Sequence, residues 1–191
     1  MDGLRARPRR VAPPAASALA PDYGGAHLAD AFAIVLPGGD APTDEVDALT
    51  LARAVLAHPP RWMRALLALR DALVRPFGLK TTAAMREQLA RSGAAHVDIF
   101  RLLSAAPQEV MFGERDRHLD FKLSILLRPA EGSPSASSSS PRREIVATTV
   151  VHCHNRLGRA YLALILPGHV FVVRSLLKEA GRRWRGVSGG C

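Results

Sequence analysis

Two segments of the chain alternate between apolar and polar side chains with a period of two. Over 118–127 every odd position is apolar, while the even positions start with His118 and Asp120. Over 145–153 the odd positions are again mostly apolar and include Val151. A period of two is typical of a strand that buries one face. We therefore predict two strands whose odd positions point toward the core.

These two strands are predicted to pair with each other in antiparallel orientation. Their apolar faces coincide only when the numbers of paired residues sum to an even value. A sum near 272 sets two pairs opposite each other, His118 with His154 and Asp120 with His152. The four polar side chains are then expected to share one face, the outer face of the sheet, which points away from the core.

The remaining pattern predicts further strands and helices. In chain order these are a strand over 30–36, helices over 45–57 and 61–75, strands over 97–103 and 109–113, and a long helix over 159–183 that Pro167-Gly168 breaks or kinks. The segment 81–95 stays open between a short helix and a loop. This order is typical of the α+β class, with helices packed on one face of an antiparallel sheet.

The helix over 61–75 has an apolar stripe that we expect to face the core. Its members recur at helical spacing and are Trp62, Leu66, Leu69 and Leu73. Arginines occupy the other faces of this helix, so the stripe predicts one buried side and one exposed side.

Length and composition predict one domain with extensions. The chain has 191 residues and a hydrophobic content of 48%, values that suit a globular domain with a real core. Residues 1–21 are rich in Pro, Arg and Ala and are predicted to be a disordered arm. We place the domain at 22–184, with a flexible Ser-rich loop over 129–141 and a tail over 185–191.

The net charge of +9 is concentrated at the two ends of the chain. Residues 1–22 carry +2 and residues 174–191 carry +4, so the central part is only weakly basic. A specific nucleic-acid-binding surface needs a basic stripe with interleaved aromatic side chains. Aromatic residues make up only 5% of this chain. We therefore do not expect nucleic acid as a partner.

The cysteines and the N-terminal segment predict a cytoplasmic protein. Cys153 falls in a predicted strand and Cys191 is the last residue, a placement that argues against a disulfide framework. The first arginines are followed by a Pro/Ala mixture rather than by a continuous apolar core, so the segment is a poor signal peptide.

The junction after the second alternating strand predicts how the long helix begins. Asn155 is placed to cap the helix, and Gly158 is placed to let the helix approach the sheet closely. A functional alternative has Arg156 or Arg159 binding a carboxylate or phosphate at the mouth of a cavity, assisted by the helix N-terminus. The sequence favours capping and packing over anion binding.

Several motifs occur together and in order along the chain. They are Asp30-Ala-Phe, Pro60-Arg-Trp62, the segments 69–79, 113–122 and 149–162, and Ile165-Leu-Pro-Gly-His169. Over residues 22–180 this pattern resembles the bacterial domain-of-unknown-function family 2867. One departure is Gly168, where the family pattern leads us to expect a bulky aromatic side chain.

The resemblance implies a helix-grip fold, similar to that of the START and polyketide-cyclase-like superfamily. In such a fold a curved antiparallel sheet wraps around a long C-terminal helix and often leaves an apolar cavity. Some relatives are fused to short-chain-dehydrogenase-like domains, but this chain has no Gly-x-Gly-x-x-Gly element after its first strand. We therefore expect no dinucleotide site, and the resemblance implies no settled catalytic activity.

The four residues of the predicted outer face suggest a different chemistry. They are His118, Asp120, His152 and His154. Two-residue spacing on a strand places ligands on one face, and imidazole with carboxylate suits zinc or iron. The same groups can form an acid–base pair. Because strand alternation directs them outward, we predict no metal and no other cofactor. An enzyme or an accessory subunit, acting beside a dehydrogenase-like partner, stays the alternative.

The favoured function is the binding of a small apolar or amphipathic ligand between the sheet and the last helix. The residues predicted to line its cavity are Trp62, Phe121, Tyr161, Ile165 and His169. Two of them, Tyr161 and His169, are expected to supply the polar contacts.

A membrane association is the remaining alternative. Residues 160–177 are nearly all apolar, but Pro167 and Arg174 leave an uninterrupted run below the roughly 20 residues of a membrane span. A core helix gripped by a sheet explains this composition better. Peripheral attachment to a membrane surface, assisted by Arg182, Arg183 and Arg185, is kept as the weaker possibility.

Overall fold

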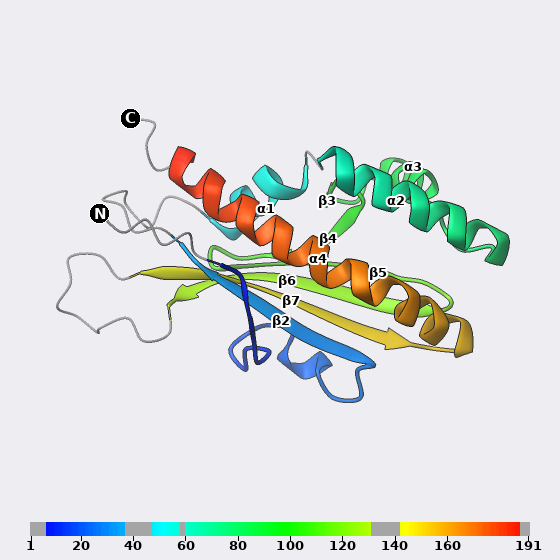
Figure 1. The fold of residues 1–191 in the computed structure, drawn as a ribbon, viewed down its shortest axis with the longest axis horizontal. Coiled ribbons are helices and arrows are strands. Elements are labelled where there is room, and N and C mark those ends of the chain that lie inside the picture. Colours follow the sequence, from blue (N-terminus) through cyan, green and yellow to red (C-terminus); the bar gives the residue numbers. More distant parts are fainter. Residues whose placement is uncertain (1–6, 37–46, 58–59, 131–141, 188–191) are drawn as a thin grey trace.

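A computed structural model describes residues 7–36, 47–57, 60–130 and 142–187 of the protein. Its elements are β1 (Arg9–Val11), η1 (Ala20–Asp22), β2 (Leu28–Val35), α1 (Ala48–Leu56), α2 (Arg61–Val74), η2 (Arg75–Phe77), α3 (Thr82–Ser92), β3 (His96–Val97), β4 (Phe100–Ala105), β5 (Glu109–Arg115), β6 (Leu119–Pro129), β7 (Arg143–Cys153) and α4 (Arg156–Val187). The strands form one antiparallel sheet in the order β1-β2-β7-β6-β5-β4-β3. The predicted α+β class, with a curved antiparallel sheet and a long C-terminal helix, is confirmed (Figure 1).

The two faces of the sheet have different coverings. Helices α1, α2 and α4 lie over one of them, which we term the helix face (Figure 1). The main apolar core lies there and includes Phe32, Phe112, Ile145 and Leu177. The opposite side, which we term the outer face, carries a smaller buried cluster of Ala31, Ala33, Leu126 and Val146.

The predicted pairing of β6 with β7 is confirmed in its register. Asp120 lies opposite His152 and Leu119 lies opposite Cys153, so paired numbers sum to 272. Odd positions of β6 face the core, where Ile125 and Leu127 are buried. Alternation determines this register because a slip by one residue would turn every apolar side chain of the strand to the outer face.

The prediction of a disordered arm over 1–21 is wrong for residues 7–21. β1 extends the sheet by pairing with β2, and the following segment continues over the outer face, where Ser17 and Leu19 are buried. Ion pairs and hydrogen bonds attach this segment: Arg9 to Glu144, and Ser17 to Glu109. A segment with few large apolar residues is held by polar groups of the sheet together with the burial of Leu19. Residues 1–6 and 131–141, the latter most of the predicted Ser-rich loop, lie outside the described residues.

The last helix begins as predicted but does not break as predicted. The Gly158 N–H donates to Asn155 Oδ1 at 2.9 Å, so Asn155 caps the helix. A Cβ on Gly158 would overlap the backbone oxygen of His118, which confirms that a glycine permits the close approach. α4 then continues through Pro167 to Val187, into the predicted tail. The lost N–H of one proline is tolerated within a long helix that packs against β2 and β7.

The apolar stripe predicted for the second helix is wrong by one position. Leu69 and Leu73 are 56% and 43% exposed, while Met63 and Val74 are buried. The buried side of α2 therefore also includes Arg70, which follows Met63 by seven residues and precedes Val74 by four. This rotation turns a charged side chain toward the space between α2 and the sheet.

Candidate ligand cavity

A large cavity lies between the helix face of the sheet, α2 and α4. Its volume is about 550 Å³, within the roughly 300–1,000 Å³ of small-molecule sites. Most of its lining is apolar and comes from all three layers, for example Leu66, Leu73, Phe121, Ile125, Ile165 and Val172. The predicted cavity between sheet and last helix is therefore present.

Four of the five residues predicted for the cavity lie in its lining. They are Phe121, Tyr161, Ile165 and His169. Trp62 lies outside this lining, in the first turn of α2, whereas Leu66, Leu69 and Leu73 of the same predicted stripe belong to it. Its ring instead packs edge-on against Phe171 of α4, with ring centroids 5.1 Å apart.

Gly168 leaves part of the cavity open. It lines the cavity from the middle of α4, and no atom lies within 4 Å of the position that its Cβ would occupy. A bulky side chain at this position would occupy this space. The glycine therefore leaves the cavity larger.

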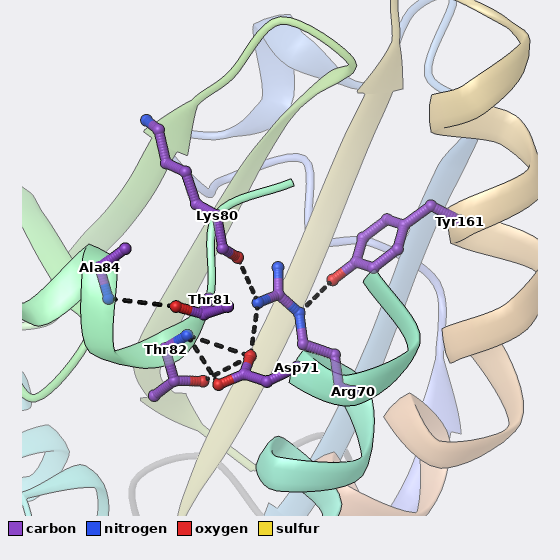
Figure 2. Close-up of polar contacts among 7 residues, drawn as sticks. All are labelled: Arg70, Asp71, Lys80, Thr81, Thr82, Ala84 and Tyr161. Carbon is purple, nitrogen blue, oxygen red and sulfur yellow. Dashed lines mark hydrogen bonds and ion pairs between the residues drawn. The ribbon is translucent and has the colours of Figure 1, made fainter. Parts of the chain in front are cut away.

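One end of the cavity contains a hydrogen-bonded group centred on Arg70 (Figure 2). The guanidinium donates from Nε to the Tyr161 hydroxyl at 3.0 Å and from Nη1 to Asp71 Oδ1 at 2.9 Å. Nη1 also donates to the backbone oxygen of Lys80 at 2.6 Å. Sequence reasoning missed Arg70, although its spacing from Met63 and Val74 is a signal that was available.

His118 packs against Tyr161 at the same end of the cavity. The two rings meet edge-on with centroids 5.4 Å apart, and His118 is 4% exposed. The prediction that His118 shares the outer face with Asp120 is wrong, because β6 begins at Leu119 and His118 belongs to the preceding turn. Burial lowers the pKa of the His118 imidazole, although Asp116 Oδ2 lies 3.6 Å from its Nδ1.

A second polar pair lies farther along α4. His169 Nε2 is 3.3 Å from Oδ1 of Asp30, a β2 residue that is 3% exposed. Sequence reasoning missed Asp30 as a site residue. Strand alternation was a usable signal, because Asp30 shares a face of β2 with Phe32 and Ile34, and these two residues face the core. A carboxylate buried among apolar neighbours requires a partner, and His169 supplies it.

The sequence matches a family model over residues 23–176, and the family is described as a protein of unknown function, DUF2867. The chain belongs to the DUF2867 family. No curated protein and no solved structure matches it. The family confirms the resemblance drawn from the motifs but assigns no activity to the cavity of this DUF2867 protein.

The remaining polar residues of the predicted outer face are separated from the cavity. Asp120 Oδ1 lies 3.0 Å from His154 Nε2, and Asp120 Oδ2 lies 3.3 Å from Arg115. His152 Nε2 is 3.5 Å from the backbone oxygen of Gly24. With His118 on the other face, the four predicted residues form no single centre. In the described ranges, no three His, Cys, Asp or Glu side chains are grouped to hold a metal ion.

The two candidate anion-binding arginines are also outside the cavity. Arg156 and Arg159 are exposed on the first turn of α4 and do not belong to the described lining. The lysine and arginine side chains in the described lining are instead Lys80 and Arg70.

Proposed function

We propose that this DUF2867 protein binds a small apolar or amphipathic molecule between its sheet and α4. The observation that supports this most strongly is the open cavity of about 550 Å³ with a predominantly apolar lining. Transfer of an apolar ligand from water into such a cavity is favourable by roughly 25 cal/mol per Å² of apolar surface removed from water.

The two polar groups favour an amphipathic ligand over a hydrocarbon. Tyr161 and His169 both line the cavity from α4 and are separated by eight residues, or about 12 Å at 1.5 Å per residue. A molecule with an apolar middle and polar ends matches this spacing. Apolar contacts supply affinity, and the polar groups select orientation.

The proposal is tested by filling the cavity. Nile red, a neutral dye that fluoresces in apolar surroundings, is titrated into the full chain and into a Gly168→Phe variant. We expect saturable binding to the wild type and a loss of at least about tenfold in affinity for the variant, because the phenyl ring occupies ligand space. Native mass spectrometry of the purified protein supplies a second readout, a co-purified small molecule.

Ala163→Phe is the matched control. Ala163 is exposed on α4 outside the described lining, so the same ring is added to the same helix without entering the cavity. Its dye affinity should equal that of the wild type. Absence of binding to the wild type, or equal binding by the Gly168 variant, would contradict the proposal.

A second candidate, attachment to a membrane surface, is favoured by the rim of the cavity. Leu69, Leu73 and Leu164 line it and are 56%, 43% and 54% exposed. By length and composition α4 could also cross a membrane between Arg156 and Trp184, a criterion that core helices of soluble proteins meet as well. Co-sedimentation with phosphatidylcholine vesicles, lost on Leu69→Ser with Leu164→Ser, would support surface attachment. A cytoplasmic location and a dehydrogenase-like partner stay predictions.

A further inference from the structure

We propose that the ligand carries a neutral hydrogen-bond acceptor, such as a carbonyl oxygen, which Arg70 and Tyr161 bind together. This inference rests on the proposed function, because it names the chemical class of molecule that the cavity takes. It is carried by two neighbouring donors in the cavity lining for which the described residues supply no acceptor.

The first donor is the Nη2 group of Arg70. A guanidinium has five N–H donors, and the Nε and Nη1 groups bind Tyr161, Asp71 and the Lys80 backbone. Nη2 makes no hydrogen bond with the described part of the chain. In Figure 2 it points into the space between Lys80 and Tyr161. Its N–H groups are therefore directed at a position that a ligand atom can occupy.

The second donor is the hydroxyl of Tyr161. Its oxygen accepts from Arg70 Nε at 3.0 Å, so its own proton is directed elsewhere. Among the described residues no side chain or backbone oxygen accepts that proton. A carbonyl oxygen has two lone pairs and can accept from both donors at once.

The pair is held in place before a ligand arrives. Asp71 binds Arg70 and also accepts from the first turn of α3, from Thr82 N at 3.0 and 2.9 Å and from Thr82 Oγ1 at 3.1 Å (Figure 2). The edge of His118 contacts the Tyr161 ring. Because these groups are already ordered, a ligand loses less conformational entropy from the protein on binding.

Charge decides between a neutral acceptor and an anion. The same end of the cavity is lined by the carboxylates of Glu114 and Asp116, and Lys80 Nζ lies 3.6 Å from Glu114. Arg70 is neutralised by Asp71. A ligand carboxylate would lose its hydration and meet no uncompensated cation, because Lys80 is paired with Glu114 as Arg70 is with Asp71. It would also lie near the carboxylate of Asp116, whereas a carbonyl oxygen accepts the hydrogen bonds without that repulsion.

Three probes with one ring system test this assignment: tetralin, 1-tetralone and tetralin-1-carboxylate. Their affinities are measured by displacement of Nile red from the wild type, Tyr161→Phe and Tyr23→Phe. We expect the wild type to bind 1-tetralone about tenfold more tightly than tetralin, which corresponds to the net gain of one or two hydrogen bonds. The carboxylate should bind most weakly of the three. The infrared C=O stretch of bound 1-tetralone should lie at a lower frequency than that of 1-tetralone in an apolar solvent.

The Tyr161→Phe variant should lose most of the ketone preference and of the infrared shift while its tetralin affinity stays unchanged. Tyr23, whose hydroxyl donates to Pro14 away from the cavity, is the matched control, and its variant should keep both. Equal affinity of the wild type for tetralin and 1-tetralone overturns the inference but leaves the proposed function standing. A tightest-binding carboxylate, or an unchanged preference in Tyr161→Phe, also overturns it. Failure of all probes and of Nile red overturns both.

Discussion

The two faces of the sheet are shielded from water in different ways. Each carries buried apolar side chains that must be shielded from water. On the outer face the N-terminal segment provides the cover and is attached through buried carboxylates: Glu144 is 0% exposed and binds Arg9 and Arg128. On the helix face α1, α2 and α4 provide the cover but leave about 550 Å³ unfilled.

This difference shows how a single sheet can combine stability with a binding site. Polar attachments require specific geometry at each group, so the outer face is closed by fixed partners such as Ser17 and Ser124 around Glu109. Apolar contacts are non-directional, and a helix can shield a sheet while bridging an open space. We therefore expect substitutions on the outer face to cost stability and substitutions over the cavity to change binding.

The largest effect is expected where α4 contacts the turn before β6. Gly158→Ala would bring a Cβ into the backbone oxygen of His118, which also accepts from His154 N at 2.9 Å. Neither backbone can move without losing that hydrogen bond, so we expect a loss of about 3 kcal/mol or more in the free energy of unfolding. Urea denaturation followed by tryptophan fluorescence measures it. A loss below about 1 kcal/mol would show that the contact is not tight.

The next largest effect concerns the outer face. Glu144→Ala removes the fully buried carboxylate that binds both Arg9 and Arg128. Since both arginines are partly exposed, we expect a loss of about 2 kcal/mol. Glu87→Ala, which removes an exposed i,i+4 pair with Arg91, is the control and should change stability by less than about 0.5 kcal/mol. Equal effects of the two variants would remove the distinction between a buried and an exposed pair.

A smaller effect is expected from pH at the end of the cavity. Burial lowers the pKa of His118 in the folded state below its unfolded value. Below the unfolded pKa of about 6.5 the unfolded state binds a proton that the folded state does not, so stability falls as the pH falls. Chemical denaturation at pH 7 and pH 5 measures the fall. It should be smaller in His118→Asn, and an identical fall in both proteins would assign the effect to other groups.

The smallest effect has the opposite sign. Gly168→Ala adds a methyl group where no atom lies within 4 Å, and alanine is a better helix former than glycine. We expect a gain of about 0.5–1 kcal/mol in the free energy of unfolding. Gly158→Ala and Gly168→Ala together compare two glycines of one helix: Gly158 contacts the backbone of His118, and Gly168 lies over the cavity. A destabilised Gly168 variant would mean that the space is not open.

Sequence reasoning succeeded where many side chains alternate along a strand, and it failed for the orientation of single side chains. The register of β6 and β7 followed from nine or more alternating side chains, each of which would be misplaced by a slip. His118 escaped this rule because it lies one residue before β6, where the strand no longer determines direction. Arg70 escaped because a helix with leucines on two sides can rotate by one position at little cost in the pattern, and only packing selects the side.

The sequence by itself determined the α+β class, the register of the central strands and the capped start of α4, because each depends on neighbours close along the chain or on a repeated pattern. Tertiary structure alone decided that residues 7–21 are ordered, that α2 turns Arg70 inward and that a cavity stays open beside Gly168. These outcomes depend on contacts between segments far apart in the chain, such as Arg70 with Tyr161, whose energies no local pattern contains.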